Sequence, residues 1–144
     1  MFLIETDVVL AVSSIGDLHH AEAVRLLEVF RGRLMLSPFT LVEGDLLVRS
    51  GRFKVKSLSN FHEALENLLD LYEVRVVAPR PRHHAVAEEL RGRVPELTYF
   101  DSLHASVALV EGAELISYDT VYAHVAGLSR VHPRDALKRR RGAQ

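Results

Sequence analysis

The sequence of 144 residues contains no cysteine, and this absence excludes several kinds of chemistry at once. Disulfide bonds, thiolate ligands for a metal and cysteine nucleophiles are all ruled out. The chain also lacks a run of about 20 apolar residues, the length needed to cross a bilayer. The opening MFLIE has no basic segment and reaches an acidic residue too early for a signal peptide. We therefore expect a cytoplasmic protein with no membrane partner.

The sequence also has little net charge, since 18 Lys and Arg residues stand against 19 Asp and Glu residues. A formal net charge of -1 says little about partners, but the distribution of basic residues says more. Arg139, Arg140 and Arg141 follow one another near the C-terminus, where they could contact a phosphate backbone or form a solvated, frayed tail. The length and a hydrophobic fraction of 48% suit one core, so we expect a single domain over residues 1–137 and a basic tail over 138–144.

Hydrophobic periodicity predicts short strands that alternate with helices. Strands are expected at 2–5, 34–36, 74–78, 115–116 and 129–132, and helices at 18–31, 38–49, 60–72, 81–91, 98–113 and, briefly, 119–127. Residues 51–57 read as a loop, and we find no internal repeat. The alternation is typical of βαβ units, so it predicts an α/β fold with a mainly parallel central sheet and helices on both faces.

Three acidic residues come at or just after the ends of predicted strands. Glu5 and Asp7 follow the first strand, and Asp119 follows the strand at 115–116 with two residues between. In an open α/β sheet, ligands bind beyond the carboxyl ends of the parallel strands, so these acids are well placed for chemistry. Asp119, taken alone, is equally typical of a helix N-cap.

Glu43 lies within a predicted helix, on the same face as the apolar residues Leu46 and Leu47. A carboxylate on an apolar face has to be paired, protonated or bound to a cation, because a bare buried charge costs roughly several kcal/mol. Either a cation or an ion pair with Arg49 or Arg75 would satisfy it.

Asp101 stands in the first turn of the predicted helix that Thr98 opens. The spacing of these two residues fits a capping box, which is a purely structural role. His104 comes one turn later, where it could support Asp101 or simply fill the helix face. These alternatives are open for each residue alone.

Taken together, the acids indicate a metal site, because a parallel sheet would bring their segments to one edge. Carboxylates about 4 Å apart repel one another by about 4 kcal/mol per pair at an effective dielectric constant near 20, so the cluster requires a cation. Mg²⁺ or Mn²⁺ is expected, since these ions bind oxygen ligands. Such a site suits phosphodiester hydrolysis by an activated water, without a serine or histidine nucleophile.

The acids and their surroundings resemble the PIN-domain ribonucleases, in particular the VapC-like toxins of prokaryotic toxin–antitoxin pairs. The segment LIETDVVL at 3–10 is similar to the family's first strand and its Asp-Thr-Asn or Asp-Thr-Asp signature, with Glu5 in place of the first aspartate. The segments SPFTLVE at 37–43, DSLHA at 101–105 and LISYD at 115–119 resemble those that carry the later acids. SRVHP at 129–133 resembles the family's last strand and its proline.

The resemblance implies a PIN-like three-layer fold and cleavage of RNA inside the chain, with Mg²⁺ or Mn²⁺ as cofactor. It also implies a homodimer and an antitoxin protein that blocks the site. The catalytic and metal-binding residues would be Glu5, Asp7, Glu43, Asp101 and Asp119, with Thr6, Ser117 and His104 in support and Arg139, Arg140 and Arg141 on the RNA. Because Glu5 has a longer side chain than aspartate, either Glu5 or Asp7 could be the main first ligand.

Two other functions fit parts of the sequence. The change to Glu5 suits a catalytically weak or inactive PIN-like module that binds RNA or protein. The segment ETDVV also imitates the Asp-x-Asp loop of haloacid-dehalogenase-type phosphatases, although glutamate is a poor replacement for the nucleophilic aspartate. Titration with manganese separates the metalloenzyme from a module that binds no metal.

Overall fold

The central feature of the structure is a parallel sheet of five strands in the order β3-β2-β1-β4-β5. The structure, a computed structural model, describes residues 1–143. The strands are β1 (Phe2–Ile4), β2 (Leu34–Leu36), β3 (Arg75–Val76), β4 (Glu114–Ile116) and β5 (Arg130–Val131). Ile4 pairs with Leu36 of β2 and with Ile116 of β4, so the next residue of each strand emerges at the same edge of the sheet. The predicted α/β class with a parallel sheet is confirmed.

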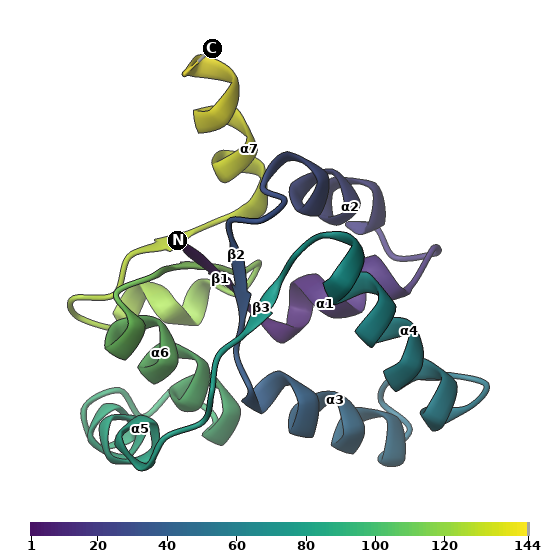
Figure 1. Ribbon diagram of the computed structural model, residues 1–144. Coiled ribbons are helices and arrows are strands. Elements are labelled where there is room, and N and C mark those ends of the chain that lie inside the picture. The colour runs from purple at the N-terminus through teal and green to yellow at the C-terminus, as the bar shows by residue number, and fades with distance from the viewer. Residues whose placement is uncertain (144) are drawn as a thin grey trace.

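Helices cover both faces of this sheet, which makes the fold three-layered (Figure 1). The helices are α1 (Thr6–Ser13), α2 (His20–Val29), α3 (Phe39–Arg49), α4 (Leu58–Leu71), α5 (Pro81–Arg93), α6 (Tyr99–Glu111) and α7 (Pro133–Gly142), with a short 3₁₀ helix η1 (Thr120–His124). Figure 1 shows α5 and α6 on one side of the sheet and α1, α2 and α4 on the other. None of the helices in the described part of the chain is long and apolar enough to span a bilayer.

Successive strand residues point to opposite faces, and each face has its own core. Leu3 and Leu115 pack with residues of α5 and α6, while Ile4 and Ile116 pack with residues of α1, α2 and α4. All four side chains are fully buried. A parallel sheet that is covered on both sides needs apolar residues at every position, and this explains the unbroken apolar triplets of β1 and β2.

The structure differs from the predicted elements at α1, at β3 and at the start of α2. Helix α1 was not predicted, because its run of valines suggests a strand; in the structure it begins directly after β1 and buries Val8 and Val9. Strand β3 is limited to two residues at the sheet edge. Helix α2 begins at His20 instead of next to Asp17, whose carboxylate accepts a hydrogen bond from the backbone N–H of His19 in the preceding turn.

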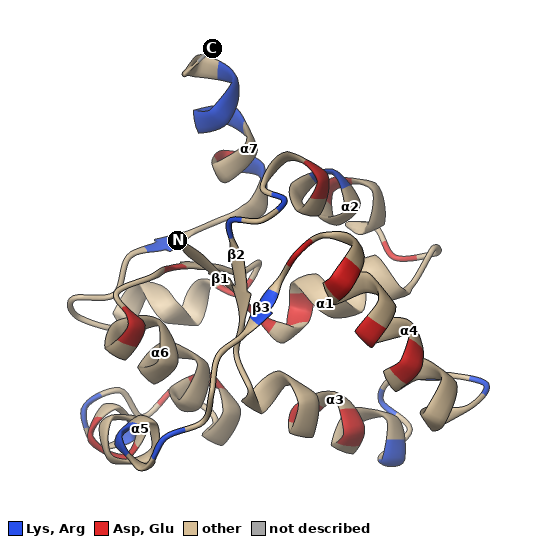
Figure 2. Ribbon diagram, in the orientation of Figure 1, with Lys and Arg blue, Asp and Glu red and all other residues tan. Residues whose placement is uncertain are grey.

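The basic C-terminal segment is helical, whereas a tail was predicted from residue 138. Helix α7 runs through that position to Gly142, and Leu137 packs into the core with α2. Arg139 contacts the carboxylate oxygens of Glu114 at 3.0 and 3.2 Å. Figure 2 shows basic residues along the outer turns of α7. The division at residue 137 therefore coincides with no break in secondary structure, and residue 144 lies outside the described residues.

Candidate active site

The carboxyl ends of β1, β2 and β4 meet at one edge of the sheet, and each continues into a buried polar residue. These residues are Glu5, Ser37 and Ser117. The backbone N–H of Glu5 donates to the carbonyl oxygen of Ile116 at 3.1 Å, which holds Glu5 at the sheet edge. Glu5 as a whole is only 6% exposed. The sheet thus places a carboxyl group in the interior, beside the starts of α1 and α3.

Glu43 from α3 and His104 from α6 complete a compact cluster with Glu5. The Nε2 atom of His104 lies 2.9 Å from Oε1 of Glu43 and 3.6 Å from Oε1 of Glu5. One ligand atom from each of the three residues lies within 4.8 Å of the others. His104 is fully buried. It lies 99 positions after Glu5 in the sequence, so the fold brings the two residues together.

Hydroxyl groups surround the imidazole ring of His104. Thr6 Oγ1 lies 3.2 Å from Nε2 and 3.0 Å from Thr40 Oγ1, while Ser37 Oγ lies 2.9 Å from Nδ1. Sequence analysis missed Ser37 and Thr40 as parts of the site. Ser37 could have been found from its position, because it directly follows β2 as Ser117 directly follows β4.

Asp7 lies next to this cluster, in the first turn of α1. Its Oδ2 atom accepts hydrogen bonds from Ser117 Oγ at 2.9 Å and from the backbone N–H of Tyr118 at 2.8 Å. Ser117 Oγ also lies 3.3 Å from Glu5 Oε2. The other carboxylate oxygen of Asp7, Oδ1, is buried and has no hydrogen-bond partner within residues 1–143. A buried acceptor of this kind has the capacity for one more ligand.

Burial and mutual repulsion perturb the acids of this site. Burial raises the pKa of Glu5 well above its ordinary value, and the negative charges of Asp7 and Glu43 raise it further. Burial also raises the pKa of Asp7, against the hydrogen bonds that it accepts from Ser117 and Tyr118. Burial acts in the same direction on Glu43, but His104 outweighs it and brings the pKa of Glu43 below the usual value. Glu5 is therefore the acid whose ionised form the protein compensates least.

Asp101 and Asp119 make the capping contacts that the sequence had left as alternatives. Asp101 accepts a hydrogen bond from the backbone N–H of Thr98 at 2.9 Å, and its own N–H donates to Thr98 Oγ1 at 3.2 Å. Asp119 accepts a hydrogen bond from the N–H of Val121 at 2.9 Å. The hydroxyl group of Tyr122, which sequence analysis did not single out for the site, donates to Asp101 Oδ1 at 3.4 Å. Capping leaves carboxylate lone pairs free for a ligand.

A pocket beside the cluster is lined by Glu43, Asp101 and Asp119 together. Leu46 and Leu47 of α3 line the same pocket, and Leu46 is 49% exposed. The apolar face that carries Glu43 therefore borders an open pocket, whereas the sequence had suggested a face in the core. All the predicted acids lie around this end of the sheet, although only Glu5 and Glu43 join the cluster with His104.

Two alternatives that the sequence left open are not found among residues 1–143. Glu43 pairs with neither arginine, since Arg49 binds Asp45 at 2.7 Å and Arg75 contacts the sulfur of Met35. His104 makes no hydrogen bond to Asp101 in the described structure and instead contacts Glu43. The spacing of residues within one helix could not reveal this partner from another helix.

Comparison with known proteins identifies the family. The sequence profile described as PIN domain matches residues 2–128. The chain belongs to the PIN domain family. No curated protein is similar enough in sequence to match it. Family membership also removes the basis for a haloacid-dehalogenase-type phosphatase.

Solved structures with the same fold include proteins from toxin–antitoxin systems. VapC20 of Mycobacterium tuberculosis, described as a sarcin–ricin loop cleaving toxin, has a TM-score of 0.73 and 22% identity over 92% of this chain and 100% of its own. VapBC2 of Rickettsia felis, bound to a promoter DNA fragment, has a TM-score of 0.69 and 18% identity over 91% of this chain and 97% of its own. FitAcB of Neisseria gonorrhoeae has a TM-score of 0.67 and 19% identity over 93% of this chain and 99% of its own. At these identities, the likeness establishes the PIN fold.

The donor atoms of this PIN domain suit a divalent cation. Glu5 and Glu43 offer carboxylate oxygens within 4.8 Å of each other, and Asp7 adds a buried oxygen without a partner in the described structure. Burial, and then the charges of Asp7 and Glu43, raise the pKa of Glu5, and a cation would offset both effects by stabilising the ionised carboxylate. The chemistry of the residues therefore fits the metal that the sequence predicted.

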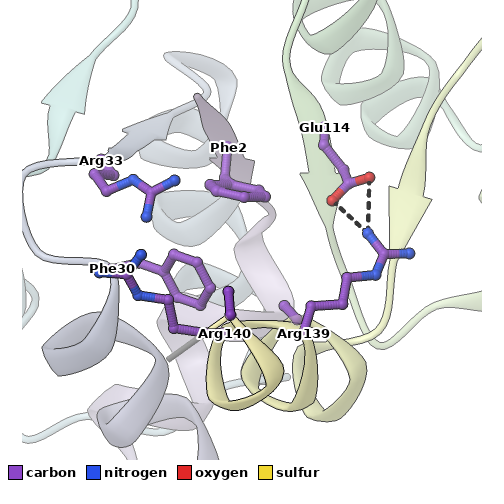
Figure 3. Close-up of a pocket in the computed structure, with 8 residues that line it drawn as sticks. Phe2, Phe30, Arg33, Glu114, Arg139 and Arg140 are labelled. Carbon is purple, nitrogen blue, oxygen red and sulfur yellow. Dashed lines mark hydrogen bonds and ion pairs between the residues drawn. The ribbon is translucent and has the colours of Figure 1, made fainter.

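The arginines predicted to bind RNA lie at the opposite end of the PIN domain. Figure 3 shows a pocket lined by Phe2, Phe30 and Arg33 with Arg139 and Arg140 of α7. Phe2 begins β1, whereas Glu5 follows its end, so the sheet separates this pocket from the acids.

Proposed function

We propose that this PIN domain is a metal-dependent endoribonuclease of the VapC type that hydrolyses RNA phosphodiester bonds with Mg²⁺ or Mn²⁺. The observation that carries the proposal is the gathering of Glu5, Asp7 and Glu43 at the carboxyl ends of the parallel strands, beside a pocket that Asp101 and Asp119 also line. Buried like charges are unfavourable in the free protein, so their concentration here supports a site built for a cation.

Within this proposal, Glu5, Asp7 and Glu43 would hold the cation, which would supply an activated water and stabilise negative charge on the phosphoryl group. Asp101 lines the same pocket and would orient or deprotonate the attacking water. Thr6 and Ser117 support the site through their contacts with His104, Glu5 and Asp7.

Other residues of the pocket suit a nucleic acid chain. Arg52 lines the pocket and offers a positive charge to a phosphate group. Tyr99 also lines it and is 54% exposed, so its ring is available to stack on a base. The RNA would thus be held by its backbone and by stacking, with its scissile phosphate near the acids.

We also propose a homodimer and an antitoxin partner. The structural neighbours include a toxin–antitoxin complex from Klebsiella pneumoniae and VapBC2 from Rickettsia felis. On this chain, Leu41, Val42 and Leu46 leave an exposed apolar surface on α3, which a protein partner could cover.

A second function, a catalytically weak or inactive binding module, draws support from the contact between Glu43 and His104. At 2.9 Å, this contact compensates the charge of Glu43 without a metal. The change from aspartate to Glu5 favours the same alternative. Such a module would bind RNA or protein but would not cut RNA.

The test is RNA cleavage with Mg²⁺ or Mn²⁺ by the wild type, Asp101→Asn and Asp119→Asn. We expect metal-dependent cleavage by the wild type and a loss of about 100-fold or more in Asp101→Asn, if this carboxylate handles the proton of the attacking water. The exposed Glu66→Gln variant, purified in the same way, should cleave like the wild type and controls for general effects of a substitution. Equal cleavage by all four proteins would refute the proposal, and metal-independent RNA binding without cleavage would favour the module.

A further inference from the structure

We propose that His104 is itself a ligand of the cation, through Nε2, and that this nitrogen makes the site select Mn²⁺ or another divalent transition-metal ion over Mg²⁺. The inference rests on the proposed metal site and goes beyond it, because it assigns the ligand set and the class of metal. Neither depends on which RNA is cut.

The distances around His104 Nε2 suit coordination of one ion. Two ligands that each lie about 2.1 Å from a cation and are at right angles to each other are about 3.0 Å apart. His104 Nε2 lies 2.9 Å from Glu43 Oε1 and 3.6 Å from Glu5 Oε1. A small adjustment of Glu5 would therefore allow all three atoms to bind the same cation.

The ring of His104 is already held in an orientation suited to a ligand. Nδ1 lies 2.9 Å from Ser37 Oγ, and the ring stacks near Phe100 with a centroid separation of 6.4 Å. Histidines that bind metals usually have their second ring nitrogen fixed by a hydrogen bond in this way. Because His104 is fully buried, water does not compete for Nε2, which already lies near the two carboxylates.

Glu5 makes the geometry possible through its length. Its side chain begins at the sheet edge and brings Oε1 to 3.6 Å from His104, while Oε2 stays 3.3 Å from Ser117 Oγ. An aspartate at this position would be shorter by one methylene group. We therefore infer that Glu5 and His104 act together, and that the unusual first acid serves a nitrogen-containing ligand set.

The nitrogen donor determines which metal is favoured. Mg²⁺ prefers oxygen ligands and retains its water, whereas imidazole suits transition-metal ions, whose affinity rises from Mn²⁺ to Cu²⁺. Two carboxylates alone would attract either kind of ion. Adding His104 shifts the preference towards the transition metals.

The alternative is that His104 only positions Glu43 by a hydrogen bond, with the metal bound to oxygen atoms. Pulsed electron paramagnetic resonance of the Mn²⁺-loaded protein separates the two, because it detects a nitrogen nucleus bonded to the ion. We expect a nitrogen signal in the wild type that changes when histidine is labelled with ¹⁵N. A bound Mn²⁺ without this signal would overturn the proposal, as would a failure to bind Mn²⁺.

Calorimetry gives a second readout with His104→Gln, whose amide can place an oxygen near the position of Nε2. We expect Mn²⁺ affinity to fall about tenfold or more in this variant while Mg²⁺ affinity changes little. The exposed His124→Gln is the matched control and should match the wild type. Equal losses for both ions in a variant that still unfolds cooperatively in EDTA would contradict the inference. If the variant does not fold, the wild-type resonance experiment decides alone.

The RNA cleavage assay keeps this inference distinct from the proposed function. A nitrogen signal from a protein that cuts no RNA supports the ligand assignment and refutes the nuclease. Cleavage by a protein whose Mn²⁺ shows only oxygen ligands supports the nuclease and refutes the role of His104.

Discussion

Replacing Glu5 by glutamine should stabilise the metal-free protein at neutral pH. Glu5 is 6% exposed, and its ligand oxygen lies within 4.8 Å of that of Glu43. Two negative charges at this distance repel by about 3.5 kcal/mol at an effective dielectric constant near 20. His104 offsets part of this repulsion, so we expect a gain of about 1 to 3 kcal/mol in the free energy of unfolding. For a chain of this length, that corresponds to a rise in Tm of roughly 3 to 9 °C.

The gain should depend on pH in a defined direction. Burial, followed by the charges of Asp7 and Glu43, raises the pKa of Glu5 in the folded protein above its ordinary value of 4.5. Between pH 4.5 and the raised pKa, the folded state binds more protons than the unfolded state, so this group's contribution to stability falls as the pH rises. Below pH 4.5 the carboxyl group is protonated in both states, and the advantage of glutamine should disappear.

Thermal unfolding followed by circular dichroism in EDTA, over a series of pH values, measures this effect. Glu66→Gln makes the same chemical change at an exposed position of α4 and should leave Tm nearly unchanged. If Glu5→Gln unfolds at or below the wild-type temperature at pH 7, or gains the same amount at every pH, the electrostatic reasoning is wrong. Under the proposed metal site, adding Mn²⁺ should reverse the order, because only the wild type keeps the carboxylate proposed to bind the ion.

Three further changes test other parts of the structure. Gly44→Ala should stabilise α3 by about 0.5 to 1 kcal/mol in chemical denaturation, since the added methyl group would meet Phe61 at an ordinary contact distance of 3.7 Å; a loss of stability would contradict this. Thr98→Ala should lower the free energy of unfolding by about 1 kcal/mol, because it removes the side-chain cap of α6, and an unchanged value would show that the cap contributes nothing. Truncation after Lys138 should reduce the slope of log K for RNA against log salt by up to about 0.7 per lost phosphate contact, and an unchanged slope would remove residues 139–141 from the RNA surface.

The parallel sheet could be predicted because strands that are buried on both faces have apolar residues at every position. The triplets at 2–4 and 34–36 are wholly apolar, and strands of this kind occur in parallel sheets. Helix α1 escaped prediction because its valines have a high strand propensity, which the packing of Val8 and Val9 overrides. The basic segment from residue 138 was assigned to a tail because its run of charges gives no sign that the apolar residues just before it attach a helix to the core.

The acids of the candidate site could be predicted from the sequence, but the residues that they contact could not. A carboxylate at the end of a strand or on an apolar helix face is unfavourable enough to stand out, which is how Glu5 and Glu43 were found. The partner of Glu43 was not visible, because His104 lies 61 residues away on another helix. Asp101 and Asp119 make the capping contacts that the sequence allowed and also line the pocket, while their role as ligands or catalytic groups stays a prediction.

The central place of β1 has a consequence for how the protein is made. Glu5 leaves the ribosome well before β4, but β1 lies between β2 and β4, and β4 ends only at Ile116. Until that strand is synthesised, β1 keeps an open edge and Asp7 lacks the hydrogen bonds from Ser117 and Tyr118. Closing so long a loop is slow, because its entropy is lost before the strand pairing is gained. The acids are therefore assembled only after β4 has been made, so a chain that stops before β4 would lack the complete candidate site.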